Sequence, residues 1–72
     1  MQIESMVFLA QRYADMGDAV QRQLSDVMAG RPLGDQNPNA LKIIRAFLER
    51  AVRYDVDGAQ ELVEQIDEFL AQ

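Results

Sequence analysis

The stretch that decides the fold is residues 3–29, IESMVFLAQRYADMGDAVQRQLSDVMA. Apolar side chains recur in it at intervals of three and four residues, a spacing that aligns them along one side of an α-helix. The repeating positions are Ile3, Met6, Ala10, Tyr13, Gly17, Val20, Leu24 and Val27. An apolar seam of this kind has to be buried against other helices, so the spacing predicts one long helix over residues 3–29 that packs in a bundle.

Glycine and proline mark the end of this helix and its weakest point. Gly30 suits the left-handed position that follows a helix, and Pro32 stands where the helix can no longer continue. Gly17 lies inside the stretch, where glycine costs roughly 1 kcal/mol relative to alanine. Asp18 followed by Gln21 could cap a new helix at that point. Because the apolar spacing passes Gly17 without a shift, we expect one continuous helix.

A loop and a second helix are expected next. Residues 30–37, GRPLGDQN, are rich in turn formers. Asn37 followed by Pro38 is a strong helix start, with asparagine as N-cap and proline at the first helical position. The helix expected over residues 38–54 has apolar residues around about half of its circumference, which is more than one neighbouring helix needs. We therefore expect this helix to be the central element.

The last helix completes the expected fold. Asp57 with Gln60 forms a capping-box pattern, and the helix expected over residues 58–71 is apolar on only one side. The fold class predicted is all-α: a three-helix bundle in which one long N-terminal helix packs against a shorter antiparallel helical hairpin. With 72 residues, the chain is expected to form one domain, residues 1–72.

The amino-acid inventory excludes the common catalytic and metal sites. The sequence has no cysteine and no histidine, which removes thiolate and imidazole ligands and the usual Ser-His or Cys-His nucleophiles. The spacing from Arg53 to Glu64 approximates a calcium loop, but Arg53 stands at the first ligand position, where a cation repels the ion. We therefore expect a non-enzymatic protein with no metal, no cofactor and no small-molecule substrate.

Charge and hydropathy limit the class of partner. The chain has 7 basic and 12 acidic residues, a net charge of −5, which argues against binding to nucleic acid. Residues 37–54 have four basic residues and one acidic residue, whereas residues 55–72 have six acidic residues and no basic ones. The longest apolar run, residues 6–10, is too short to span a bilayer, and the first residues lack the basic region of a secretory signal. These features predict a cytoplasmic protein that does not insert into membranes.

An apolar cluster near the N-terminus predicts the functional surface. A helix over residues 3–29 is about 40 Å long, whereas the two following helices are about 25 and 20 Å long, so its N-terminal end should stay uncovered. Phe8 lies off the seam, where a lone monomer would expose it. Uncovered apolar surface usually marks an interface. We expect an adaptor, regulator or chaperone that binds a protein partner, with a homodimer favoured. The residues expected to bind are Met6, Phe8, Leu9, Tyr13 and Met16.

Two other functions remain open. The first helix ending at residues 28–32, followed by Asn37-Pro38 and a second helix, is similar to the helical hairpin of type III secretion needle subunits. The loop here is longer and residues 55–58 interrupt the second helix, so we assign no family. The similarity implies a structural or secretion-associated subunit of a helical assembly. The second alternative is an acidic inhibitor that mimics nucleic acid through Glu61, Glu64, Asp67 and Glu68.

Overall fold

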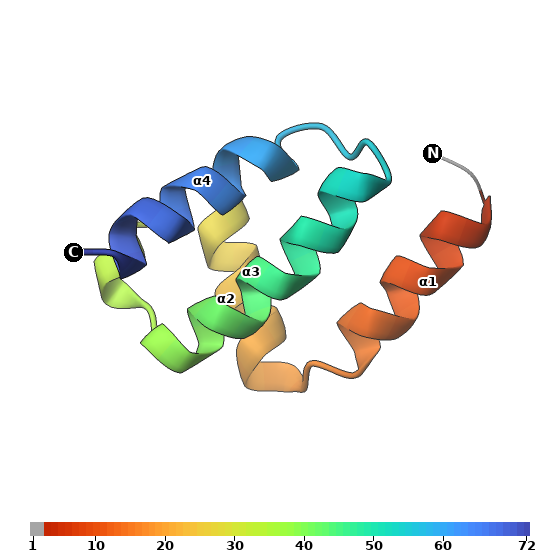
Figure 1. Cartoon of the computed structure of the whole chain (residues 1–72). Coiled ribbons are helices and arrows are strands. Elements are labelled where there is room, and N and C mark those ends of the chain that lie inside the picture. Colours follow the sequence, from red (N-terminus) through yellow and green to blue (C-terminus); the bar gives the residue numbers. More distant parts are fainter. Residues whose placement is uncertain (1–2) are drawn as a thin grey trace.

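The computed structural model describes residues 3–72, apart from the side chains of Ile3 and Ser5, as helices and their connections. The helices are α1 (Ile3–Ala14), α2 (Asp18–Met28), α3 (Pro38–Arg53) and α4 (Ala59–Leu70), with a short 3-10 helix at Leu33–Asp35 (Figure 1). The all-α class is confirmed, but the expected count of three helices is wrong, since the described residues form four α-helices. None of the helices within residues 3–72 is long and apolar enough to cross a bilayer.

The prediction of one helix over residues 3–29 is wrong because the chain breaks at Gly17. This glycine has a φ of 83° and a ψ of 158°, a backbone conformation that is almost exclusive to glycine. α1 therefore ends at Ala14, and α2 starts at Asp18 in a new direction (Figure 1). The side-chain amide of Gln21 donates a hydrogen bond to the carbonyl oxygen of Tyr13 at 2.8 Å, which links the two helices across the break.

The break allows both N-terminal helices to pack on α3. A continuous helix over residues 3–29 is about 40 Å long and extends far beyond α3, whose 16 residues span about 24 Å. After the break, α2 and α1 each contact α3. Apolar side chains of both helices therefore pack on α3, whereas a straight helix would extend beyond α3 at one end.

The hydrophobic core lies among α2, α3 and α4, and α3 is its central element. α3 packs against each of the other three α-helices. The buried core consists of Leu24, Val27, Leu41, Ile44, Leu48, Val63 and Ile66. Burying one such side chain is worth about 1.5–3 kcal/mol. Most of the apolar burial that stabilises the fold therefore comes from α2, α3 and α4.

The start of α3 matches its sequence signal. The Oδ1 atom of Asn37 accepts hydrogen bonds from the backbone nitrogens of Asn39 at 2.8 Å and Ala40 at 3.4 Å, and Pro38 is the first helical residue. The backbone nitrogen of Asn37 donates to Oε1 of Gln23 at 2.9 Å. These bonds cap α3 and connect its first turn to α2.

A tight turn joins α3 to α4 without the predicted capping box. Gly58 is the N-cap of α4, with a φ of 83° and no side-chain cap bond. The prediction that Asp57 and Gln60 cap this helix is therefore wrong. Nε2 of Gln60 instead donates to Oε1 of Glu64 at 3.0 Å, one turn along the helix. The left-handed glycine, rather than a side chain, sets the entry into α4.

Candidate interaction surface on α1 and α3

α1 packs on α3 as an antiparallel arm through two contacts between aromatic rings. Phe8 meets Tyr54 edge to face, with ring centroids 5.9 Å apart. Farther along α1, Tyr13 meets Phe47 with a centroid separation of 6.4 Å. Both distances lie in the range in which aromatic pairs attract one another. The order of the pairs, Phe8 with Tyr54 and Tyr13 with Phe47, makes the two helices antiparallel (Figure 1).

Phe8 is half-buried within the chain, so the expectation that a lone monomer exposes it is wrong. The guanidinium carbons of Arg12 and Arg50 lie 5.7 and 5.1 Å from its ring centroid, within the range of cation–π attraction. The break at Gly17 is the physical reason, because it places α1 alongside α3 instead of extending it away. Phe8 therefore anchors α1 to α3.

The five residues expected to bind a partner do not form one patch. Met6 and Tyr13 are exposed, at 55% and 38% of their surface. Leu9 and Met16 are half-buried, as Phe8 is. At about 100° per residue, Met6 and Phe8 lie on nearly opposite sides of α1. The structure thus assigns Phe8 and Tyr13 to ring contacts on the α3 side, and it leaves Met6 exposed.

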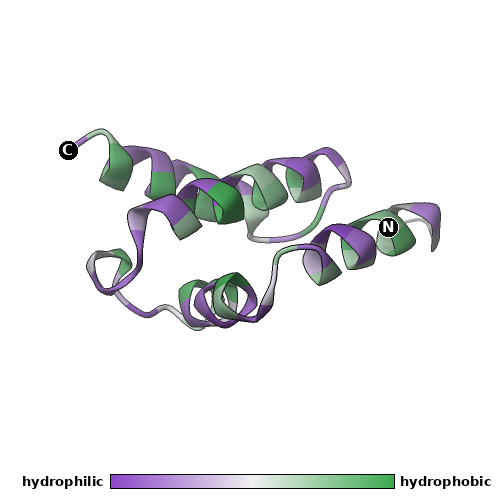
Figure 2. Cartoon of the chain, turned by 90° about the horizontal axis from the view of Figure 1, so that it is seen from below, coloured by the Kyte–Doolittle hydropathy of each residue, from purple (hydrophilic) through white to green (hydrophobic). Residues whose placement is uncertain are grey.

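The open side of α1 has a group of exposed apolar side chains, with Glu4 and Gln11 exposed beside them. We call this group the α1 face, and its exposed residues are Met6, Val7, Ala10 and Ala14. Val7 is 53% exposed. No described side chain of α1 is fully buried, and Figures 1 and 2 show this helix at one edge of the molecule. Sequence reasoning missed Val7 because it lies off the apolar seam, although the unbroken apolar run over residues 6–10 contained the signal.

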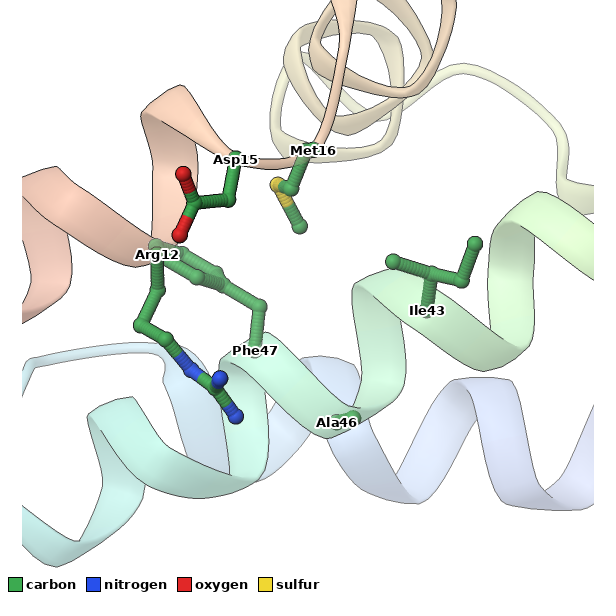
Figure 3. A pocket seen from close by; sticks show the side chains of 6 residues that line it. All are labelled: Arg12, Asp15, Met16, Ile43, Ala46 and Phe47. Carbon is green, nitrogen blue, oxygen red and sulfur yellow. The ribbon is translucent and has the colours of Figure 1, made fainter.

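A shallow hollow of about 200 Å³ lies beside the C-terminal half of α1. Figure 3 shows its lining residues, with Met16 from the α1–α2 connection and Ile43 from α3 on opposite sides. Phe47 and Ala46 add apolar surface, and Asp15 stands at the rim. Ile43 is 49% exposed, and sequence reasoning did not single it out. The unusually wide apolar surface of the helix expected over residues 38–54 was the available signal.

A second hollow, of about 180 Å³, continues from the first and is basic. It shares Arg12 and Ala46 with the apolar hollow and adds Arg50 and Arg53. Glu49 is the one acidic residue in its lining. Two of the four basic residues of α3, Arg50 and Arg53, thus lie beside Arg12 of α1.

The outer surface of α4 is acidic, as its sequence indicates. Glu61, Glu64, Asp67 and Glu68 are all exposed. Nη2 of Arg45 donates to Oδ2 of Asp67 at 3.1 Å, and Nε of Arg45 pairs with the other carboxylate oxygen. These hydrogen bonds, together with the attraction between the two charges, lower the pKa of Asp67 and raise the pKa of Arg45. The pair links α3 to α4 at the surface.

Comparison with known proteins gives no relative: no family model, no curated protein and no solved structure matches this chain. Two surfaces of the chain are candidates for a function. One is the uncharged α1 face, and the other is the groove between α1 and α3.

Proposed function

We propose that this protein is a non-enzymatic protein–protein interaction module that forms a homodimer through the α1 face. One observation supports this proposal above the others: α1 is apolar on two sides, and only one of them rests on α3. Met6 and Val7 on the other side expose more than half of their surface. Contiguous apolar surface of this kind on a small protein usually marks an interface.

The composition of the α1 face favours a second copy as the partner. Each chain has a net charge of −5, so most approaches between two copies are repulsive. The α1 face has no charged residue among its members and avoids this repulsion. Ala10 and Ala14 are one turn apart on it, and such small side chains allow two helices to approach closely. A two-fold axis through this surface would bury Met6 and Val7 of both copies.

The size of the α1 face predicts a reversible dimer. Stable interfaces typically bury about 800 Å² on each partner. The whole chain exposes 5028 Å², and α1 has only 12 residues, about 18 Å in length. One helix face provides less than the typical area, so we expect a dissociation constant in the micromolar range rather than a permanent dimer.

Sedimentation velocity over micromolar to millimolar protein concentrations tests the proposal. We expect the wild-type chain to shift from monomer to dimer as concentration rises, and Met6→Glu to remain a monomer because it places a charge in the interface. Met28→Glu is the matched control, since Met28 is 64% exposed but lies on α2. A monomeric wild type at millimolar concentration, or equal effects of the two variants, would exclude the proposal.

The same experiment separates the two alternatives. A structural subunit of a helical assembly would grow into species larger than a dimer. An acidic inhibitor that mimics nucleic acid would stay monomeric and use the exposed carboxylates of α4, of which Asp67 is already paired with Arg45. That function predicts a partner whose binding weakens steeply with salt.

A further inference from the structure

We infer that the groove between α1 and α3 binds an acidic, amphipathic segment of a partner protein. The groove consists of the apolar hollow and the basic hollow, which adjoin because both are lined by Arg12 and Ala46. Their volumes are about 200 and 180 Å³. An occupant of the whole groove therefore needs an apolar part and a negatively charged part.

The basic end of the groove lacks neutralising charge. Arg12, Arg50 and Arg53 line it, and none of the three has an ion pair among the described residues. Glu49, the acidic residue in the lining, already accepts a hydrogen bond from Nη1 of Arg45 at 2.9 Å. Three guanidinium groups on one hollow favour a ligand with carboxylate groups, which such groups can bind through paired hydrogen bonds.

Two of these arginines are held in place before a ligand arrives. The guanidinium groups of Arg12 and Arg50 both lie over the ring of Phe8, at 5.7 and 5.1 Å. Restricting long side chains in advance lowers the entropy lost on binding. Phe8 thus orders the basic end of the groove as well as anchoring α1.

The apolar end sets the orientation of the occupant. Met16, Ile43 and Phe47 line it, and nearly half of the Ile43 surface is exposed. Asp15 and Arg12 both line this hollow, so their charges offset one another (Figure 3), and the uncompensated positive charge lies at the other hollow, at Arg50 and Arg53. From Ile43 to Arg53 the α3 axis covers about 15 Å. The occupant should therefore have an apolar anchor and a carboxylate two to three helical turns apart.

This chemistry favours a protein segment over nucleic acid. A phosphate backbone would use the arginines but leave the apolar hollow empty, and the chain's net charge of −5 opposes a long polyanion. An amphipathic helix or peptide satisfies both ends of the groove. The α1 face lies on the other side of α1, so the groove can be tested separately from dimer formation.

A labelled peptide with the sequence of residues 58–72, GAQELVEQIDEFLAQ, is a suitable probe because it is acidic and amphipathic. Its Phe69 and Glu61 are about 12 Å apart along a helix, close to the required spacing. Fluorescence anisotropy with the full-length protein should show saturable binding that weakens with salt. One exposed ion pair changes the affinity by less than tenfold, so two arginines are replaced together. The double variant Arg50→Gln, Arg53→Gln should bind the peptide about tenfold more weakly.

Three comparisons decide between outcomes. Arg53→Gln alone leaves the contacts of Phe8 intact and should still weaken binding, whereas Arg22→Gln on α2, outside the groove, should not. The same peptide with glutamine and asparagine in place of its acidic residues should bind more weakly than the acidic one. The inference is overturned if no saturable binding occurs, if the neutral peptide or the Arg53→Gln protein binds equally well, or if duplex DNA displaces the peptide at equal concentration.

Discussion

Gly17 determines where the first third of the chain lies. A φ of 83° with a ψ of 158° ends α1, and the next residue begins α2. No atom lies within 4 Å of the position that a Cβ would occupy at Gly17. The requirement for glycine is therefore one of backbone conformation and not of space. A single residue thus decides between a long continuous helix and an arm folded onto α3.

We expect Gly17→Ala to shift the chain toward a continuous helix. Alanine in the observed conformation costs about 1–3 kcal/mol, whereas alanine inside a helix is favoured over glycine by about 1 kcal/mol. Far-UV circular dichroism should show more helix, and nuclear Overhauser effects between the rings of Phe8 and Tyr54 should be lost. Gly34→Ala is the control, because Gly34 has equally open surroundings and no positive φ. Unchanged helix content with the ring contacts retained would contradict this interpretation.

Among the elements, α1 differs from the other helices in how little of it is buried. The core residues come from α2, α3 and α4, while Leu9 and Phe8 of α1 reach only partial burial. Contacts of this kind give a helix lower local stability than the core has. We therefore expect α1 to separate from α3 more readily than the core helices separate from one another.

Shortening one side chain in the core and one in α1 should lower the free energy of unfolding by different amounts. Ile44→Ala, at a site with no exposed surface, should lower the free energy of unfolding by about 2–5 kcal/mol. Leu9→Ala should lower it by only about 1 kcal/mol, because Leu9 is half-buried. Urea denaturation measures both, and Ile44→Val, expected to cost about 0.5–1.5 kcal/mol, provides a milder core variant. Equal losses for Leu9→Ala and Ile44→Ala would place α1 in the core.

The pairing of α3 with α4 should depend on pH through Asp67. Its pKa in the folded chain lies below its ordinary value of 3.8, so the unfolded chain binds more protons as pH falls. The stabilisation is complete above that ordinary value and is lost as pH falls through the lowered pKa. Asp67→Asn should therefore be less stable than wild type near neutral pH, with a difference that shrinks in acid and in high salt. Glu68→Gln is the control, because Glu68 is a neighbouring exposed carboxylate with no ion pair among the described residues; if both variants lose the same stability near neutral pH, the Arg45–Asp67 pair is not the cause.

The sequence predicts the start of α3 better than it predicts how the helices are arranged in space. Asn37 and Pro38 predict the start of α3 because a cap depends only on neighbouring residues. The break at Gly17 was not predictable from the apolar spacing, because the spacing is the same whether the chain bends or not. Only the gain from packing α1 and α2 separately on α3 decides between these possibilities. The exposure of Phe8 was mispredicted for the same reason.

The candidate site was also predictable only in part. Met6 belongs to the apolar seam of the sequence, and it is exposed because α3 packs against the opposite side of α1, at Phe8. The exposure of Val7 and Ile43 is evident only from the arrangement of the helices, because each has several apolar neighbours in the sequence. The groove joins residues of α1 and the α1–α2 connection to residues of α3 more than twenty-five positions away, a relation that no local pattern contains.

For the whole molecule, the central claim is that a small, strongly acidic chain leaves one uncharged apolar face free for a second copy. Its net charge of −5 opposes association through other surfaces, so a substitution that disrupts the α1 face should also abolish self-association. The most direct test is to detect the contact between the α1 faces of two copies.

That detection requires a mixture of isotope-labelled and unlabelled chains at millimolar concentration. Isotope-filtered nuclear Overhauser spectra of the mixture report only protons that approach one another across an interface. The account predicts cross-peaks between copies from the methyl groups of Met6 and Val7, and none from the methyl group of Met28, which is equally accessible on α2. Cross-peaks from Met28 alone, or none from any methyl group, would contradict it.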